Sequence, residues 1–140
     1  MPHITQETAT AFAQAWIAAW NRHDLDAVLD LFSQDFEFCS PYVIELANEA
    51  SGCLRGHEAV RRYWETGLAR IPDLHFRLID VLAGVSSLTI YYAGHRGMVA
   101  ETFHLDGTGK ALKAAACYSV SPSGESHAAI TPGSENAAGR

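Results

Sequence analysis

The hydrophobic period of the chain changes at Pro72, and this change constrains the fold more than any other feature. Before Pro72, apolar residues recur at helical spacing apart from one alternating stretch at 35–40, and after it they alternate. The helical ranges are 6–22, 24–32 and 59–71. The alternating ranges are 35–40, 74–82, 88–95, 98–105 and 112–120, and 41–55 predicts only a short turn of helix under a loop. Helices followed by a four-strand meander predict an α+β domain.

Size, charge and hydropathy exclude several classes of protein. A length of 140 residues suits one domain, which we place at 1–122, and such a domain folds without a metal or a disulfide. The net charge of -6 argues against a nucleic-acid partner, and no apolar run is long enough to span a membrane. From Ser121 onward the composition shifts to Ser, Gly, Ala, Pro and Glu, which predicts a flexible tail at 123–140.

The three cysteines, Cys39, Cys53 and Cys117, are odd in number and lack C-x-x-C spacing. They therefore indicate neither a zinc site nor a disulfide framework, and we expect reduced thiols in a cytoplasmic protein. The seven histidines show no metal-binding spacing, so we predict no metal and no cofactor. The N-terminus lacks the pattern of a signal peptide.

Three blocks of sequence occur in a characteristic order. They are 20–26 with Leu31-Phe32 and Asp35-Phe36; 54–60, Leu-Arg-Gly-His-Glu-Ala-Val; and 101–106, Glu-Thr-Phe-His-Leu-Asp, with Gly109-Lys110. Together they resemble the SnoaL-like branch of the nuclear transport factor 2-like superfamily. The resemblance implies three N-terminal helices packed on a strongly curved, mostly antiparallel sheet that forms a cone-shaped pocket. It also implies a homodimer through the outer face of the sheet.

Glu101 is the one acid in an apolar stripe of a predicted strand. Alternation places Val99, Glu101, Phe103 and Leu105 on one face, which we take to be the inward one. Loss of hydration raises the pKa of a carboxyl group, so Glu101 is a candidate acid or base. The other interpretation is a structural carboxylate, bonded to Tyr118, a tryptophan N–H or an arginine.

The remaining candidates share the pocket side of their elements. If Arg77 faces solvent, Asp80 faces inward and is a second candidate catalytic residue. An outward Lys113 in turn places Leu112, Ala114, Ala116 and Tyr118 inward. The candidate ligand-binding residues are Trp16, Trp20, Phe38, Tyr42, Trp64, Tyr92, His95, Phe103 and Tyr118. An aromatic pocket of this kind suits a flat, apolar small molecule, although each aromatic residue also fits an ordinary core, and His95 also fits an exposed turn.

The resemblance does not bring a complete catalytic site. Glu101 matches the neutral acid of ketosteroid isomerases, but Trp16 and Ser40 stand where those enzymes have a tyrosine and a general base. Ala116 stands near the position of an epoxide hydrolase aspartate. Three hypotheses follow. The first is an acid/base enzyme of cyclase, isomerase or hydrolase type that acts on a small apolar cyclic or polyketide-like compound. The second is a non-catalytic small-molecule-binding or dimerisation domain, and the third is a protein-recognition module.

Overall fold

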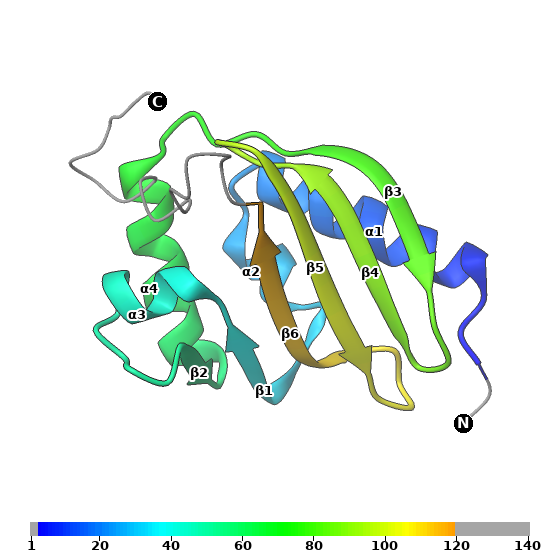
Figure 1. Ribbon diagram of the computed structural model, residues 1–140. Helices are drawn as coiled ribbons and strands as arrows, with labels where there is room; N and C mark the ends of the chain where they lie inside the picture. The colour runs from blue at the N-terminus through cyan, green and yellow to red at the C-terminus, as the bar shows by residue number, and fades with distance from the viewer. Residues whose placement is uncertain (1–2, 120–140) are drawn as a thin grey trace.

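The computed structural model describes residues 3–119 and has the expected order of helices and strands apart from one additional short strand (Figure 1). The helices are α1 (Gln6–Asn21), α2 (Leu25–Leu29), α3 (Pro41–Leu46) and α4 (His57–Arg70). The strands are β1 (Phe32–Cys39), β2 (Cys53–Arg55), β3 (Arg77–Ala83), β4 (Ser87–Ala93), β5 (Met98–Leu105) and β6 (Ala111–Tyr118). None of the described helices is long and apolar enough to cross a membrane. The tail predicted at 123–140 lies outside the described residues.

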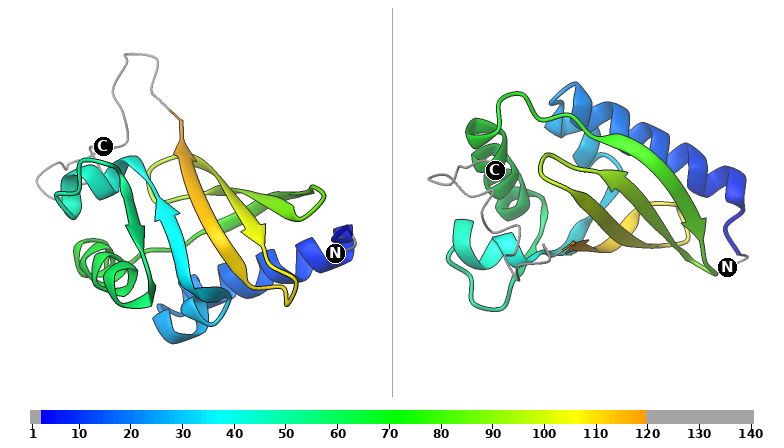
Figure 2. Two further views of the ribbon diagram at one scale, coloured as in Figure 1. Left: turned by 90° about the horizontal axis from the view of Figure 1, so that it is seen from below. Right: turned by 45° about the horizontal axis from the view of Figure 1, so that its top comes forward.

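The strands form one curved, open sheet in the order β2-β1-β6-β5-β4-β3. Neighbouring strands are antiparallel except β1 and β6, which run parallel. Figures 1 and 2 show α1 crossing one face of the sheet, while α3 and α4 lie beside the end formed by β1 and β2. The predicted α+β class and mostly antiparallel sheet are confirmed.

Helix α1 seats its apolar face on the sheet. The Thr5 side chain caps the helix by accepting a hydrogen bond from the Thr8 N–H at 3.0 Å. Phe12 and Trp16, one turn apart on the buried face, bring their rings to within 5.2 and 5.5 Å of the Phe103 ring on β5. The helix therefore stands on the inner face of the strand that carries Glu101.

The structure differs from the sequence prediction at the start of β1 and at β2. Phe32 begins β1 instead of ending the second helix, which has only five residues. Strand β2 was not predicted, because three residues are too few for alternation to show. It forms because β1 offers a free edge, to which it pairs antiparallel.

Shifts in strand register turn two side chains outward, and two predictions were therefore wrong. The β5–β6 pairing shifts between His104 and Leu105, so Ala111 faces inward and Leu112 is 48 % exposed. The β3–β4 pairing shifts between Leu78 and Asp80, and Asp80 lies exposed instead of facing inward. A shift of one residue reverses the face of every side chain beyond it.

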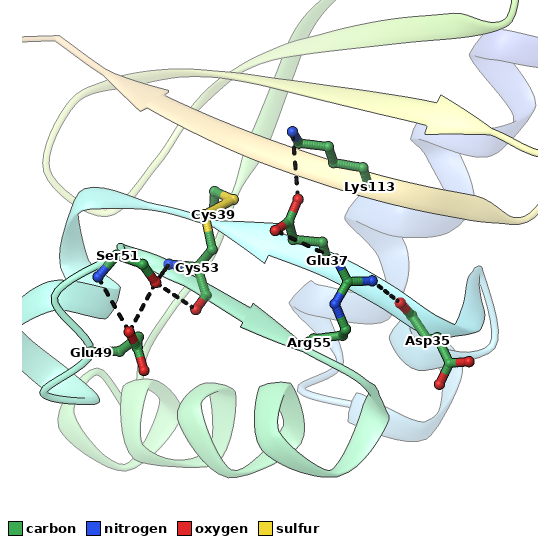
Figure 3. A network of polar contacts seen from close by, with 8 residues as sticks. All are labelled: Asp35, Glu37, Cys39, Glu49, Ser51, Cys53, Arg55 and Lys113. Atoms are coloured by element: carbon green, nitrogen blue, oxygen red, sulfur yellow. Dashed lines mark hydrogen bonds and ion pairs between the residues drawn. A yellow bond between two sulfur atoms is a disulfide. The ribbon is translucent and has the colours of Figure 1, made fainter.

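Cys39 and Cys53 form a disulfide, so the expectation of reduced thiols was wrong for this pair (Figure 3). The two residues face each other directly across the β1–β2 ladder. Their pairing was not visible in the sequence because it depends on β2. Beside them, Glu37 lies 3.5 Å from Lys113 and 3.7 Å from Arg55 (Figure 3).

We expect Cys53→Ser to lower the free energy of unfolding by about 3 kcal/mol, because the disulfide closes a short loop in the unfolded chain. Urea denaturation without reductant measures the loss, and Cys117→Ser, which removes the exposed free thiol, is the matched control. Three reactive thiols in the native wild-type protein would contradict the disulfide.

Candidate functional site

A cavity of about 620 Å³, including its open mouth, lies between the sheet and the helices. Its lining comes from α1, α3, α4, β1, β5, β6 and the segment before β3. The lining residues are Trp20, Phe38, Tyr42, Leu46, Tyr63, Trp64, Gly67, Leu68, Ile71, Leu74, Phe76, Glu101 and Tyr118. This apolar and aromatic lining with few polar groups is typical of sites for small organic molecules.

Edge-to-face aromatic contacts form the walls of the pocket. The Trp64 ring lies 5.1 Å from the Trp20 ring and 5.5 Å from the Phe38 ring. On α3, the Tyr42 ring lies 4.6 Å from the Tyr118 ring. These contacts join three helices to β1 and β6, so the pocket surface is made of side chains that support one another.

Ser40 positions the α3 wall. Its hydroxyl caps α3 by accepting the Tyr42 N–H at 3.2 Å, and Pro41 follows at the first helical position. The same hydroxyl donates to the Tyr118 hydroxyl at 3.3 Å. Ser40 is therefore a positioning residue between two walls, a role that its place before Pro41 did not reveal.

The end of α1 positions a third wall. The Asn21 amide donates to the Phe76 carbonyl at 2.9 Å and accepts the Phe76 N–H at 2.7 Å. The His23 ring bonds the Leu74 carbonyl at 2.9 Å. His23 adopts a φ of 58°, the left-handed conformation that turns the chain away from the helix. Asn21 and His23, which the sequence placed only at the end of a helix, thus hold Leu74 and Phe76 in the pocket lining.

Glu101 is the one carboxyl group among the described lining residues, and it is only 4 % exposed. Its Oε1 accepts a hydrogen bond from the Tyr92 hydroxyl at 3.1 Å. Burial raises the pKa of Glu101 to about 7, and the Tyr92 bond opposes this by lowering it. Near neutral pH the group therefore exists in both protonation states, as an acid/base catalyst requires.

The tyrosines around Glu101 stay neutral. Burial raises the pKa of Tyr63 to about 12, and burial raises the pKa values of Tyr92 and Tyr118 well above the ordinary value. Each of these phenols keeps its proton at neutral pH, so each can donate a hydrogen bond but none can act as a base.

Three buried polar atoms have no partner among the described residues: Trp16 Nε1, Trp20 Nε1 and the Tyr42 hydroxyl. An unsatisfied buried donor destabilises a protein by about 1–3 kcal/mol. Trp20 and Tyr42 line the pocket, whereas Trp16 lies in the core beside it. Unsatisfied donors at a cavity wall mark a place where a bound molecule can supply acceptors.

The structure brings together most, but not all, of the residues expected at the site. Those that line the pocket are Trp20, Phe38, Tyr42, Trp64, Glu101 and Tyr118. Trp16, Tyr92 and Phe103 are buried outside the lining, whereas His95 and Asp80 are exposed. Tyr63 and Phe76 were missed; Tyr63 follows the helical spacing of α4, which was the available signal.

Only one cluster in the described part of the chain has the composition of a metal site. The ligand atoms of Glu37, Cys39 and Cys53 lie within 4.8 Å of one another. The two sulfurs are bonded to each other, whereas a metal requires free thiolates. This cluster does not fit a metal ion in its disulfide form.

Comparison with known proteins agrees with this geometry. Residues 13–124 match the SnoaL-like domain family. A SnoaL-like protein of unknown function from Burkholderia thailandensis is 47 % identical, with a TM-score of 0.81 over 84 % of this chain and 98 % of its own. None of the curated proteins matches the chain.

Two more distant structures share the fold alone. A cystatin-like protein of unknown function from Methylobium petroleophilum is 14 % identical, with a TM-score of 0.67 over 86 % of this chain and 81 % of its own. A protein from Catenulispora acidiphila with a ketosteroid isomerase-like fold, in complex with trimethylamine, is 21 % identical, with a TM-score of 0.63 over 79 % of this chain and 86 % of its own.

The raised pKa of Glu101 predicts how stability depends on pH. The folded protein binds this proton more tightly than the unfolded chain does, so raising the pH from about 4.5 to 7 destabilises the wild type relative to Glu101→Gln. We expect a relative loss of about 3 kcal/mol across this window and a constant difference above it. Urea denaturation of both proteins at several pH values measures it; parallel curves would contradict a raised pKa.

Proposed function

The chain belongs to the SnoaL-like domain family, and on that premise we propose that it is a cofactor-independent acid/base enzyme acting on a small apolar cyclic or polyketide-like compound. The observation that carries the proposal is Glu101: a buried carboxyl group in an otherwise aromatic and aliphatic pocket. Isolating a carboxyl group in this way is unfavourable for folding, and catalytic sites are where such arrangements concentrate.

The chemistry is a proton transfer that Glu101 performs alone. The carboxylate takes a proton from a carbon next to a carbonyl group, and the electron pair of the C–H bond moves toward the carbonyl oxygen. The resulting carboxylic acid returns the proton to the same or another carbon, which restores the carboxylate. A pKa of about 7 lets Glu101 perform both halves of the cycle at neutral pH.

The Tyr92 hydroxyl supports this cycle by fixing the carboxyl group. It donates a hydrogen bond to Oε1 at 3.1 Å. Tyr92 is buried but does not line the cavity, so it acts as a positioning residue that fixes the carboxyl group. One oxygen of Glu101 is thereby held in place.

The second candidate is a non-catalytic small-molecule-binding domain with the same pocket. It is favoured by the exposure of Asp80 and His95, which leaves Glu101 without a second acid/base side chain among the described lining residues. Its ligand class is the same, because the aromatic walls are the same. Proton transfer to a bound ligand separates the two candidates.

Deuterium exchange into beta-tetralone, followed by NMR in heavy water, tests the proposal. We expect the wild type to accelerate exchange at the carbons next to the carbonyl group, and Glu101→Gln to lose about a hundredfold or more of that acceleration. Binding of tetralone should persist in Glu101→Gln.

The matched control is Glu7→Gln, which removes an exposed carboxylate from the first turn of α1 and should not change the exchange. Equal exchange in the wild type and Glu101→Gln would refute acid/base catalysis. Binding without any exchange would instead favour the non-catalytic domain.

We also propose a homodimer through the outer sheet face, because large apolar side chains remain exposed there. Leu82, Tyr91 and Leu112 are 55, 38 and 48 % exposed, each next to a buried residue of its own strand. Light scattering should give twice the chain mass for the wild type and the chain mass for the Leu82→Glu, Leu112→Glu double variant. A monomeric wild type at high concentration would contradict the proposal.

A cytoplasmic location stays a prediction. The Cys39–Cys53 disulfide weighs against it, because disulfides persist mainly in oxidising compartments.

A further inference from the structure

Two lining residues of the pocket present hydrogen-bond donors that no acceptor satisfies. They are the indole N–H of Trp20 on α1 and the hydroxyl of Tyr42 on α3. The two side chains are 6 and 5 % exposed, and each of the two atoms has less than 1 Å² of accessible surface. Bulk water therefore does not satisfy these donors.

The surrounding residues supply few hydrogen-bond acceptors for these donors. Trp20 packs edge to face against Trp64, and Tyr42 packs in the same way against Tyr118. The nearby Ser40 hydroxyl is already engaged with the Tyr118 hydroxyl and the Tyr42 N–H. The acceptor that is missing must come from outside the described residues.

The charge of the lining restricts which acceptor fits. Glu101 is the one ionisable group besides the tyrosines, and no lysine, arginine or histidine is among the described lining residues. An anionic ligand would meet the Glu101 carboxyl group with no cation among the described lining residues, although the charge of Arg96 reaches Tyr42 from outside the lining, and this carboxyl group disfavours its binding. An amine would pair with Glu101 but bring donors, which leaves the Trp20 indole N–H, a donor only, unsatisfied.

We propose that the ligand is a neutral ring compound bearing ketone-type carbonyl oxygens, and that Trp20 Nε1 and the Tyr42 hydroxyl select it by donating to those oxygens. The inference rests on the proposed function of the pocket and specifies its ligand. It also assigns roles to two residues that the proton-transfer scheme does not use. Rings fill the aromatic walls, and the carbonyl oxygens supply the acceptors that the walls lack.

Binding must displace side chains, because neither donor atom has open surface. Trp20 and Trp64 contact each other at 5.1 Å, so separating the aromatic lining changes the surroundings of two of the three tryptophans. Tryptophan fluorescence therefore reports ligand entry directly and needs no turnover.

The experiment compares each ketone with the hydrocarbon of the same shape: indanone with indane, tetralone with tetralin, and fluorenone with fluorene. Affinities are measured by fluorescence titration on the full-length wild type, Tyr42→Phe and Trp20→Phe, with Tyr91→Phe, an exposed outer-face tyrosine, as control. Tyr42→Phe removes only the hydroxyl and spares the ring contact with Tyr118, so it remains informative if Trp20→Phe fails to fold.

In the wild type we expect each ketone that fits to bind about tenfold more tightly than its hydrocarbon. Tyr42→Phe and Trp20→Phe should each reduce that preference about threefold to tenfold, because each weakens binding of the ketone and leaves binding of the hydrocarbon unchanged. Tyr91→Phe should not change the preference.

Equal affinities for ketone and hydrocarbon in all four proteins would overturn the inference and leave the pocket function intact. Tighter binding of naphthoate than of tetralone would overturn the requirement for a neutral ligand. Failure of every compound to bind would overturn the inference together with the proposed function.

Discussion

The packing of Trp16 is the interaction on which the rest of the structure depends. Its side chain is 2 % exposed and contacts the rings of Trp20, Phe76, Tyr92 and Phe103 at 5.2–6.3 Å. A buried tryptophan removes a large apolar area from water, and these contacts fix α1 on β4 and β5. Once α1 is seated there, the end of the helix carries Trp20 and Asn21 to the pocket. The cavity lies between that end, α3, α4 and the sheet.

The same apolar packing that builds the pocket sets the chemistry of Glu101. Burial disfavours the charged carboxylate and raises its pKa to about 7, while the Tyr92 bond only partly offsets this. The unsatisfied donors of Trp20 and Tyr42 are a second energetic conflict in the same cavity. Proteins violate the rules of polar satisfaction mainly where they bind or react, because a bound molecule can relieve the conflict. Two independent conflicts thus converge on one pocket.

Local patterns predicted the fold well. The change of period at Pro72 separated helices from strands, and alternation on β5 placed Glu101 inward, where it is found. Helical and strand spacing also identified Trp20, Phe38, Tyr42, Trp64 and Tyr118 as pocket candidates. The partner of Glu101 was not predicted: the hydroxyl that bonds it belongs to Tyr92, two residues from the position opposite Glu101 on β4. Diagonal neighbours of this kind depend on register, which alternation alone does not fix.

By itself, the sequence determined which face of each element is apolar and that β5 carries one acid on its inner face, because both follow from the backbone geometry of short segments. Only the tertiary structure decided which segments meet. Register shifts turned Asp80 and Leu112 outward, and the pairing of β2 with β1 brought Cys39 and Cys53 together. The bonds from Asn21 and His23 placed Phe76 and Leu74 in the pocket. These outcomes depend on contacts between residues far apart in the chain, and a shift of one residue in pairing reverses them without changing any local pattern.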